Sequence, residues 1–182
     1  MTNVSKAIEL DRERLTRITD PHVQVSLETQ QAFGLRRKES ILMRPEWADR
    51  GDKLVLKSQW TKGGRPREIP IRTAEQRRAL DKAKALAGGS SLIPKGLRYV
   101  EQLKCFETQC AKVEIHKVHG LRHHYAQERY RELTGWECPA NGGPKSKELT
   151  ADKKLIDRVA RTTITQELGH GRLQVVGVYI GA

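Results

Sequence analysis

Apolar positions at helical spacing recur along most of the chain. A rough repeat of this kind covers residues 10–18. Asp20-Pro21 then marks a helix start, because proline is tolerated in the first helical turn. The pattern predicts a helix over residues 22–33 that ends at Gly34, and a short helix over residues 37–43.

The pattern changes to alternation after Pro45. Leu54, Leu56 and Trp60 occupy alternate positions of residues 53–60, which is typical of a strand with one buried face. Two glycines then form a turn, and residues 65–71 can return as a partner strand. We therefore expect a small antiparallel sheet.

Helical spacing resumes after the sheet. Thr73 and Gln76 form a capping box that opens a helix ending near Gly88. A second helix carries an apolar stripe with steps of three and four, made of Val100, Leu103, Phe106, Cys110 and Val113. A third is predicted over residues 119–133.

The last part of the chain holds a loop and a further helix. Residues 136–150 contain prolines, glycines and polar side chains, so we expect a mobile loop there. Residues 151–168 return to helix, with Leu155, Ile156, Val159 and Leu168 on one side and Gly169 as the stop. The predicted fold is mainly α with a small antiparallel β-sheet (α+β), in one domain over residues 1–182.

Composition adds a strong positive charge to this picture. The chain has 182 residues, and 34 Lys and Arg against 22 Asp and Glu give a net charge of +12. Such an excess attracts polyanions, and nucleic acid is the default partner. Aromatic residues are only 5%, which favours contact with duplex phosphates over base stacking. A basic surface that serves only solubility remains the alternative.

The sequence also suggests a compartment. It contains no apolar run of about 18 residues and no secretory signal. The three cysteines suit a reducing environment better than a disulfide framework. We therefore expect a cytoplasmic protein without a membrane partner.

Four separated segments carry residues suited to phosphodiester chemistry. They are Phe33-Gly-Leu-Arg-Arg-Lys-Glu39, the hairpin tip Thr61-Lys-Gly-Gly-Arg65, His119-Gly-Leu-Arg122, and Leu168-Gly-His170 with Tyr179 nine positions further on. In content and order these segments resemble the tyrosine recombinases, the phage-integrase family of site-specific DNA strand exchangers. The resemblance covers roughly residues 10–182, and it implies a small antiparallel sheet of three strands. It implies that the chain is a catalytic domain, with the separate N-terminal DNA-clamping domain absent.

The resemblance implies a role for each matched residue. Tyr179 would be the nucleophile that forms a covalent 3′-phosphotyrosine. Arg36 and Arg122 would stabilise charge on the attacked phosphate, His119 would accept a proton, and His170 would donate a hydrogen bond. Lys62 would protonate the leaving 5′-oxygen, and Glu39 would hold an arginine in place. With protein cations at the phosphate the reaction would need no metal or other cofactor. The phosphotyrosine would allow DNA to be rejoined without ATP.

Other interpretations of these residues remain open. Arg36 and its neighbour Arg37 could both be solvated helix residues, and Lys62, with Lys57 close by, could be a solvated turn tip. His119 and Arg122 could be a surface pair, and His170 could be a helix C-cap partner. Tyr179 lies in an apolar stretch that, taken locally, favours a buried strand. The two histidines after Arg122 are expected to pack or to lie near DNA rather than to act in catalysis.

Other functions also remain open. One is a type IB topoisomerase-like nicking and rejoining enzyme, and another is a non-catalytic basic DNA-binding module. Such a module could be stabilised by zinc on Cys105, Cys110, His116 and His119, although the cysteine-to-histidine gap is shorter than the ~12 residues of a finger.

Two departures from the family bear on assembly. Arg122 and His170 are 48 positions apart, which is long, and residues 136–150 account for the excess. Only three residues follow Tyr179, whereas family members commonly carry a further segment that docks on a neighbour. We expect a DNA-bound tetramer for a full-length form, with this chain monomeric alone.

Overall fold

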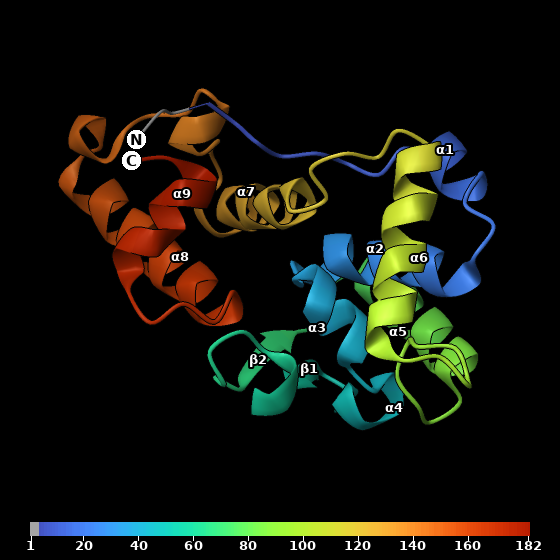
Figure 1. The fold of residues 1–182 in the computed structure, drawn as a ribbon. Coiled ribbons are helices and arrows are strands. Elements are labelled where there is room, and N and C mark those ends of the chain that lie inside the picture. Colours follow the sequence, from blue (N-terminus) through green and yellow to red (C-terminus); the bar gives the residue numbers. More distant parts are fainter. Residues whose placement is uncertain (1–3) are drawn as a thin grey trace.

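The computed structural model describes residues 4–182 and is mainly helical, with a small two-stranded antiparallel sheet (Figure 1). Its first part holds six helices and the sheet. They are α1 (Arg12–Thr16), α2 (Pro21–Phe33), α3 (Arg37–Leu42), α4 (Pro45–Ala48), β1 (Lys53–Leu56), β2 (Arg67–Pro70), α5 (Ala74–Ala87) and α6 (Tyr99–Lys112). Its second part holds α7 (Gly120–Thr134), α8 (Ala151–Glu167) and α9 (Gly177–Ile180). Short 3-10 turns lie at Ser58–Trp60, Pro139–Asn141, Ser146–Glu148 and Leu173–Val176.

The helix boundaries follow the local signals of the sequence. Asp20 caps α2 by accepting hydrogen bonds from two backbone amides, and Pro21 occupies the first turn. Gly34 ends the helix in a left-handed conformation, φ 61°. A side chain there would also collide with Tyr125, because a β-carbon would lie 2.6 Å from its ring. Thr73 and Gln76 form the expected capping box of α5. The sequence therefore predicted these helix ends correctly.

The sheet is smaller than expected. The described residues contain two strands, β1 and β2, rather than three, with Leu54 opposite Ile69 in an antiparallel register. The predicted first strand ends at Leu56, because the next residues turn into a 3-10 helix. That turn buries Trp60 and sets its ring edge-on against Trp47, with centroids 5.5 Å apart.

Two main apolar clusters stabilise the fold. The larger joins both parts of the molecule, because residues from α2, the sheet, α7, α8 and α9 all contribute to it. Phe33, Leu56, Tyr130, Ile164 and Ile180 are fully buried in it. The second cluster packs α6 against α2 and includes Phe106, Cys110 and Val113 from the predicted stripe. Burial of such side chains contributes about 1.5–3 kcal/mol each.

Helix α8 buries a different face from the one that its apolar residues predict. Three of the four predicted inward residues, Leu155, Ile156 and Val159, are 65%, 41% and 56% exposed, whereas the fourth, Leu168, is fully buried as predicted. The inward face instead carries Asp157, which accepts hydrogen bonds from the Tyr130 hydroxyl at 2.5 Å and the Ser146 hydroxyl at 2.9 Å. A satisfied buried carboxylate therefore sets the rotation of the helix, and this polar network was not visible in the hydrophobic pattern.

Residues 136–150 form an irregular connection that contacts the core. Cys138 is fully buried, and Trp136 packs against the larger cluster. Ser146 donates to Asp157 of α8, as described above. The connection is therefore fixed to α7 and α8 at several points.

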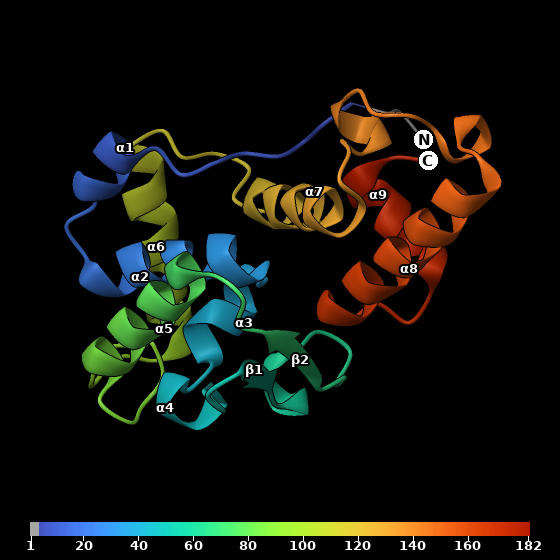
Figure 2. The same ribbon diagram turned by 180° about the vertical axis from the view of Figure 1, so that it is seen from behind.

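Helix α7 and an extended segment join the two parts of the molecule. In both views α7 lies between the helices of the first part and the pair α8 and α9 (Figures 1 and 2). The segment of residues 5–10 runs alongside α7, where Ile8 donates its backbone amide to the Gly120 carbonyl at 3.1 Å and Ser5 donates to Gln127. No helix among residues 4–182 has the length and apolar character needed to cross a membrane.

Candidate functional site

Arg122 is the buried centre of the site. It lies in the first turn of α7 and is fully buried. Its guanidinium donates to the backbone carbonyls of Gly34 and Leu168, so it connects the end of α2 to the end of α8. Burial and the neighbouring cations Arg67 and Arg36 lower its pKa to about 10, which leaves it charged at neutral pH. The fold thus holds a positive charge in one fixed place.

Tyr179 lies against this arginine. It belongs to the short helix α9, not to a strand, and is 6% exposed. Its hydroxyl lies 3.4 Å from Arg122 Nε, which donates to it, and 3.3 Å from His119 Nε2. The ring of His170 stacks on the Tyr179 ring, with centroids 5.2 Å apart and planes 25° apart. Arg122 and His119 therefore contact the hydroxyl of Tyr179, and His170 contacts its ring.

Two further contacts fix the backbone around Tyr179. Gln127 of α7 donates to the Tyr179 carbonyl at 3.0 Å. Arg161 of α8 donates to the Gly181 carbonyl, also at 3.0 Å, while its Nε donates to both oxygens of Asp157. The buried network of Asp157 thus extends to the residues that immediately follow Tyr179.

The two histidines at Tyr179 are held neutral at physiological pH. Partial burial, Arg122 and Arg36 lower the pKa of His119 below 6.5. The same causes lower the pKa of His170 to about 4. Loss of hydration and nearby cations both disfavour imidazolium. A neutral imidazole can accept a proton from the tyrosine hydroxyl, so His119 has the state that a general base needs.

The hydrogen bonds of His170 define its tautomer. Arg122 Nη2 lies 3.3 Å from His170 Nε2. Arginine can only donate, so Nε2 must accept and the ring proton must be on Nδ1. His170 Nδ1 is buried and has no hydrogen-bond partner among the described residues. The site therefore contains a buried N–H donor that awaits an acceptor, as an anion-binding site requires.

Glu39 connects Arg36 to the site. Its carboxylate is fully buried and accepts from Arg36 Nη1 at 2.8 Å and from the Arg36 backbone amide at 2.6 Å. Although burial alone would raise its pKa, Arg67, Arg122 and the Arg36 amide lower that pKa to about 2. The charged Glu39 fixes the start of α3 and with it the position of Arg36.

Arg67 is a residue of the site that the sequence patterns did not single out. It lies on the inward face of β2 and donates to both oxygens of Glu39, at 2.8 and 2.7 Å. It also packs against Gly169, where a β-carbon would lie 2.9 Å from its Cδ. The strand alternation, which places residues 67 and 69 on one face, was the available signal. It was overlooked because a buried arginine does not fit an apolar strand face.

Lys62 is not brought into contact with the other five predicted residues. It is exposed in the turn before β2 and has no hydrogen bond or ion pair among the described residues. The turn itself lies near the site, because Arg65 packs so closely on Gly171 that a β-carbon there would meet its guanidinium. Lys57 is engaged elsewhere, with its ammonium 4.0 Å from the Trp47 ring centroid. Lys62 is therefore the freer of the two lysines.

The histidines after Arg122 have different surroundings. His123 is buried, with its ring centroid 4.6 Å from that of Tyr179, and burial and His119 lower its pKa to about 4. It packs against the tyrosine as a neutral ring. His124 lines a separate cleft with Arg72 and Arg129.

The cysteines and histidines weighed for zinc do not converge. Within residues 4–182 no three His, Cys, Asp or Glu side chains are arranged to hold a metal ion. Cys105 donates its thiol to Asp20, and Cys110 is buried in the second apolar cluster.

Comparison with protein families identifies the family of the chain. A sequence model of the integrase family matches residues 4–128, and the chain belongs to this family. The match includes four of the six predicted catalytic residues, from Arg36 to Arg122, together with Glu39, and ends before His170 and Tyr179. No curated protein matches the chain. Family membership gives the chain a role in DNA integration and recombination.

Proposed function

We propose that the chain cuts and rejoins duplex DNA through a covalent 3′-phosphotyrosine on Tyr179, as a tyrosine recombinase. The observation that carries this proposal is the Tyr179 hydroxyl, held 3.3 Å from a neutral histidine and 3.4 Å from a buried arginine. A tyrosine hydroxyl needs such a base and such a cation to act as a nucleophile.

The cations and donors around Tyr179 suit the attacked phosphate. Arg36 and Arg122 would stabilise the charge that develops on the non-bridging oxygens, and His170 would donate its Nδ1 proton. One donor of this kind is worth about 10²–10³ in rate. Glu39 and Arg67 would hold Arg36 in place rather than touch the DNA.

The proton movements balance in the proposed reaction. His119 takes the proton of Tyr179 as the tyrosine oxygen bonds to phosphorus. The bond from phosphorus to the 5′-oxygen breaks, and Lys62 protonates that oxygen when the turn before β2 moves toward the site. Attack by a 5′-hydroxyl on the phosphotyrosine reverses each step and rejoins a strand, without a metal or ATP.

We further propose that the reaction takes place on a DNA-bound tetramer of the full-length protein, in a bacterial cytoplasm. Free thiols at Cys105, Cys110 and Cys138 suit a reducing compartment. A tetramer supplies one nucleophile for each of the four strands that two recombining duplexes present.

The proposal can be tested without knowing the recombination site. The protein is incubated with a pool of nicked duplexes of random sequence, and adducts that survive denaturation are isolated and sequenced. The wild type should form such adducts, Tyr179→Phe should form none, and the matched control Tyr99→Phe should behave as wild type. Adducts that persist in Tyr179→Phe would refute the nucleophile.

The same pool separates the alternatives. A common sequence among the trapped duplexes favours a site-specific recombinase, whereas trapping without sequence preference, together with relaxation of supercoiled plasmid, favours a topoisomerase-like enzyme. DNA binding with no adduct at all would indicate a non-catalytic module.

A further inference from the structure

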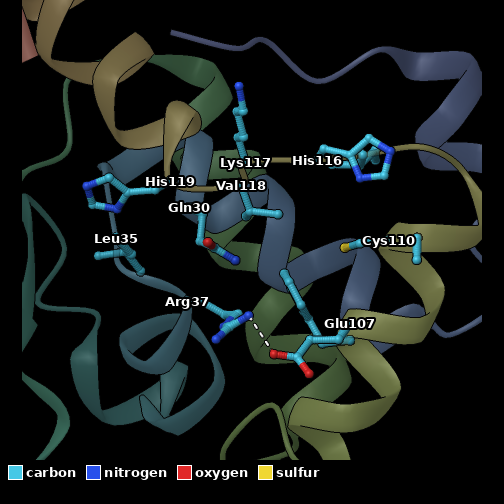
Figure 3. A pocket seen from close by; sticks show the side chains of 12 residues that line it. Gln30, Leu35, Arg37, Glu107, Cys110, His116, Lys117, Val118 and His119 are labelled. Atoms are coloured by element: carbon cyan, nitrogen blue, oxygen red, sulfur yellow. Dashed lines mark hydrogen bonds and ion pairs between the residues drawn. The ribbon is translucent and has the colours of Figure 1, made fainter. Parts of the chain in front are cut away.

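A pocket of about 500 Å³ lies beside the proposed catalytic centre and is not used by the chemistry above (Figure 3). Two segments that carry site residues form part of its wall. Leu35 and Arg37 flank Arg36, and Val118 precedes His119, which itself lines the pocket. The imidazole of His119 therefore lies between Tyr179, whose hydroxyl contacts its Nε2, and the pocket, which it lines.

One wall of the pocket is apolar. Phe106 and Cys110 come from α6, and Leu35 and Ile115 are also buried. The Ile115 amide donates to the Cys110 carbonyl at 2.9 Å, which ties the loop after α6 to that helix. The rest of the lining is polar or charged, so the pocket joins an apolar wall to groups that can orient a ligand.

Gln30 contributes a buried amide to this pocket. It is 1% exposed, and Figure 3 shows its carboxamide among Leu35, His119 and Val118. Its Nε2 makes one long hydrogen bond, 3.4 Å, to Ser26, and Oε1 accepts none among the described residues. Buried amides are normally satisfied, because an unpaired one costs about 1–3 kcal/mol. An acceptor and a donor of Gln30 thus remain available to a ligand.

The rim of the pocket carries one cation without an ion pair among the described residues, Lys117, which is exposed beside His116. Arg37 also lines the rim, but it pairs with Glu107 at 2.9 Å. A lysine beside an apolar wall suits a ligand that joins a flat ring to a phosphate. A carboxamide offers an acceptor beside a donor, which is the arrangement that pairs with a nucleobase edge.

We propose that this pocket receives one unstacked nucleobase of the DNA, from a nucleotide next to the phosphate that Tyr179 attacks. The base would lie between Leu35 and Phe106 and pair with Gln30, while its phosphate meets Lys117 at the rim. Extrusion of a base costs a few kcal/mol and depends on the base that leaves the stack, so it can contribute to discrimination among bases. The placement of the base next to the cleaved phosphate rests on the proposed function. The existence of the pocket does not depend on that function.

A direct binding test separates the pocket from the reaction. The probe is 2-aminopurine deoxyriboside monophosphate, titrated into the full chain and followed by its fluorescence. The wild type should show saturable binding in the millimolar range. Ala111→Phe, which fills the pocket from the exposed side of α6, should weaken it at least tenfold. Thr108→Phe, an exposed position on the same helix outside the pocket, should leave it unchanged.

The second test places the base on DNA. A trapped duplex is resynthesised with 2-aminopurine at each position beside the cleaved phosphate. One position should brighten severalfold on binding the wild type, and Ala111→Phe should abolish that rise. At that position Gln30→Leu should reduce the difference in adduct rate among the four bases to less than twofold, with circular dichroism confirming that the variant is folded.

The outcomes are distinct. Absence of nucleotide binding, or binding that Ala111→Phe does not weaken, overturns the pocket whether or not DNA is cleaved. Nucleotide binding without any adduct from the random pool supports the pocket and refutes the reaction. If adducts form but 2-aminopurine fluorescence rises at no position beside the cleaved phosphate, the proposal that a base is extruded is refuted.

Discussion

Arg67 and Glu39 form a two-point ion pair in the interior, with both carboxylate oxygens within 2.8 Å of the guanidinium and both side chains almost fully buried. Glu39 shares one of those oxygens with Arg36. The pair therefore connects β2 to α3 and limits where the Arg36 guanidinium can lie.

Removal of one partner should therefore destabilise the protein more than removal of both. Glu39→Gln leaves Arg67 as a buried uncompensated charge, and we expect a loss of about 3–5 kcal/mol in the free energy of unfolding. Glu39→Met combined with Arg67→Met should recover most of that loss. Urea unfolding measures both. Equal losses in the single and double variants would show that the charges do not act as a pair.

The lowered pKa values of Glu39 and His170 predict that the free energy of unfolding falls in acid. The folded-state pKa is about 2 for Glu39 against 4.5, and about 4 for His170 against 6.5. Both pKa values are lower in the folded state than in the unfolded state. The folding free energy that these groups contribute is therefore fully present above the unfolded-state pKa, and it is lost as the pH falls toward the folded-state pKa. Thermal unfolding at a series of pH values should show stability falling from about pH 6.5 downward. His170→Gln should lessen the fall between pH 6.5 and 4, to which His123 and His119 contribute as well because their pKa values are also lowered.

The rate of adduct formation should depend on pH through His119. Because its pKa is lowered from 6.5, the neutral base persists below that value, and the rate should stay level from pH 8 down to pH 6.5 before it falls. Single-turnover trapping on a saturating amount of duplex measures this. A rate that already halves near pH 7 would contradict a depressed pKa.

Arg161 should act on the rate rather than on DNA binding. It holds the Gly181 carbonyl, two residues after Tyr179, and Arg161→Gln removes that donor. We expect adduct formation to slow by about tenfold, the effect of one lost hydrogen bond of about 1.4 kcal/mol, with DNA affinity within twofold of wild type. Arg158→Gln is the matched control, since Arg158 is exposed on the same helix. Equal effects of the two variants would show a general effect of charge.

DNA affinity should depend steeply on salt, because the net charge is +12. With 6–10 phosphate contacts the affinity should fall by about 10³–10⁵ between roughly 50 and 200 mM salt. Fluorescence anisotropy with a labelled duplex measures the slope. An affinity that is flat over this range would contradict binding through DNA phosphates.

Local signals in the sequence were sufficient for most elements. Asp20-Pro21 and Gly34 bounded α2, and Thr73 with Gln76 opened α5, because caps act within one turn of the chain. Where longer-range packing decides, the sequence was insufficient. Trp60 turned out of its strand to pack on Trp47, and the apolar side of α8 faces outward because Asp157 is paired inside.

The candidate site shows the same division. The order of boxes in the sequence was enough to predict Arg36, Lys62, His119, Arg122, His170 and Tyr179 as a set, and their roles remain proposals. That His119, Arg122 and His170 all contact the Tyr179 side chain depends on how α7, α8 and α9 pack. Arg67 could not be predicted from the boxes, since its partner Glu39 is distant in the chain and only the fold buries the two together.

The sequence by itself determined the helix ends, the basic charge and the resemblance to DNA strand exchangers, because these depend on residues in place or in order. Only the tertiary structure decided which histidines are neutral and where Gln30 points. Both depend on burial and on neighbours brought from distant segments, which no local pattern specifies.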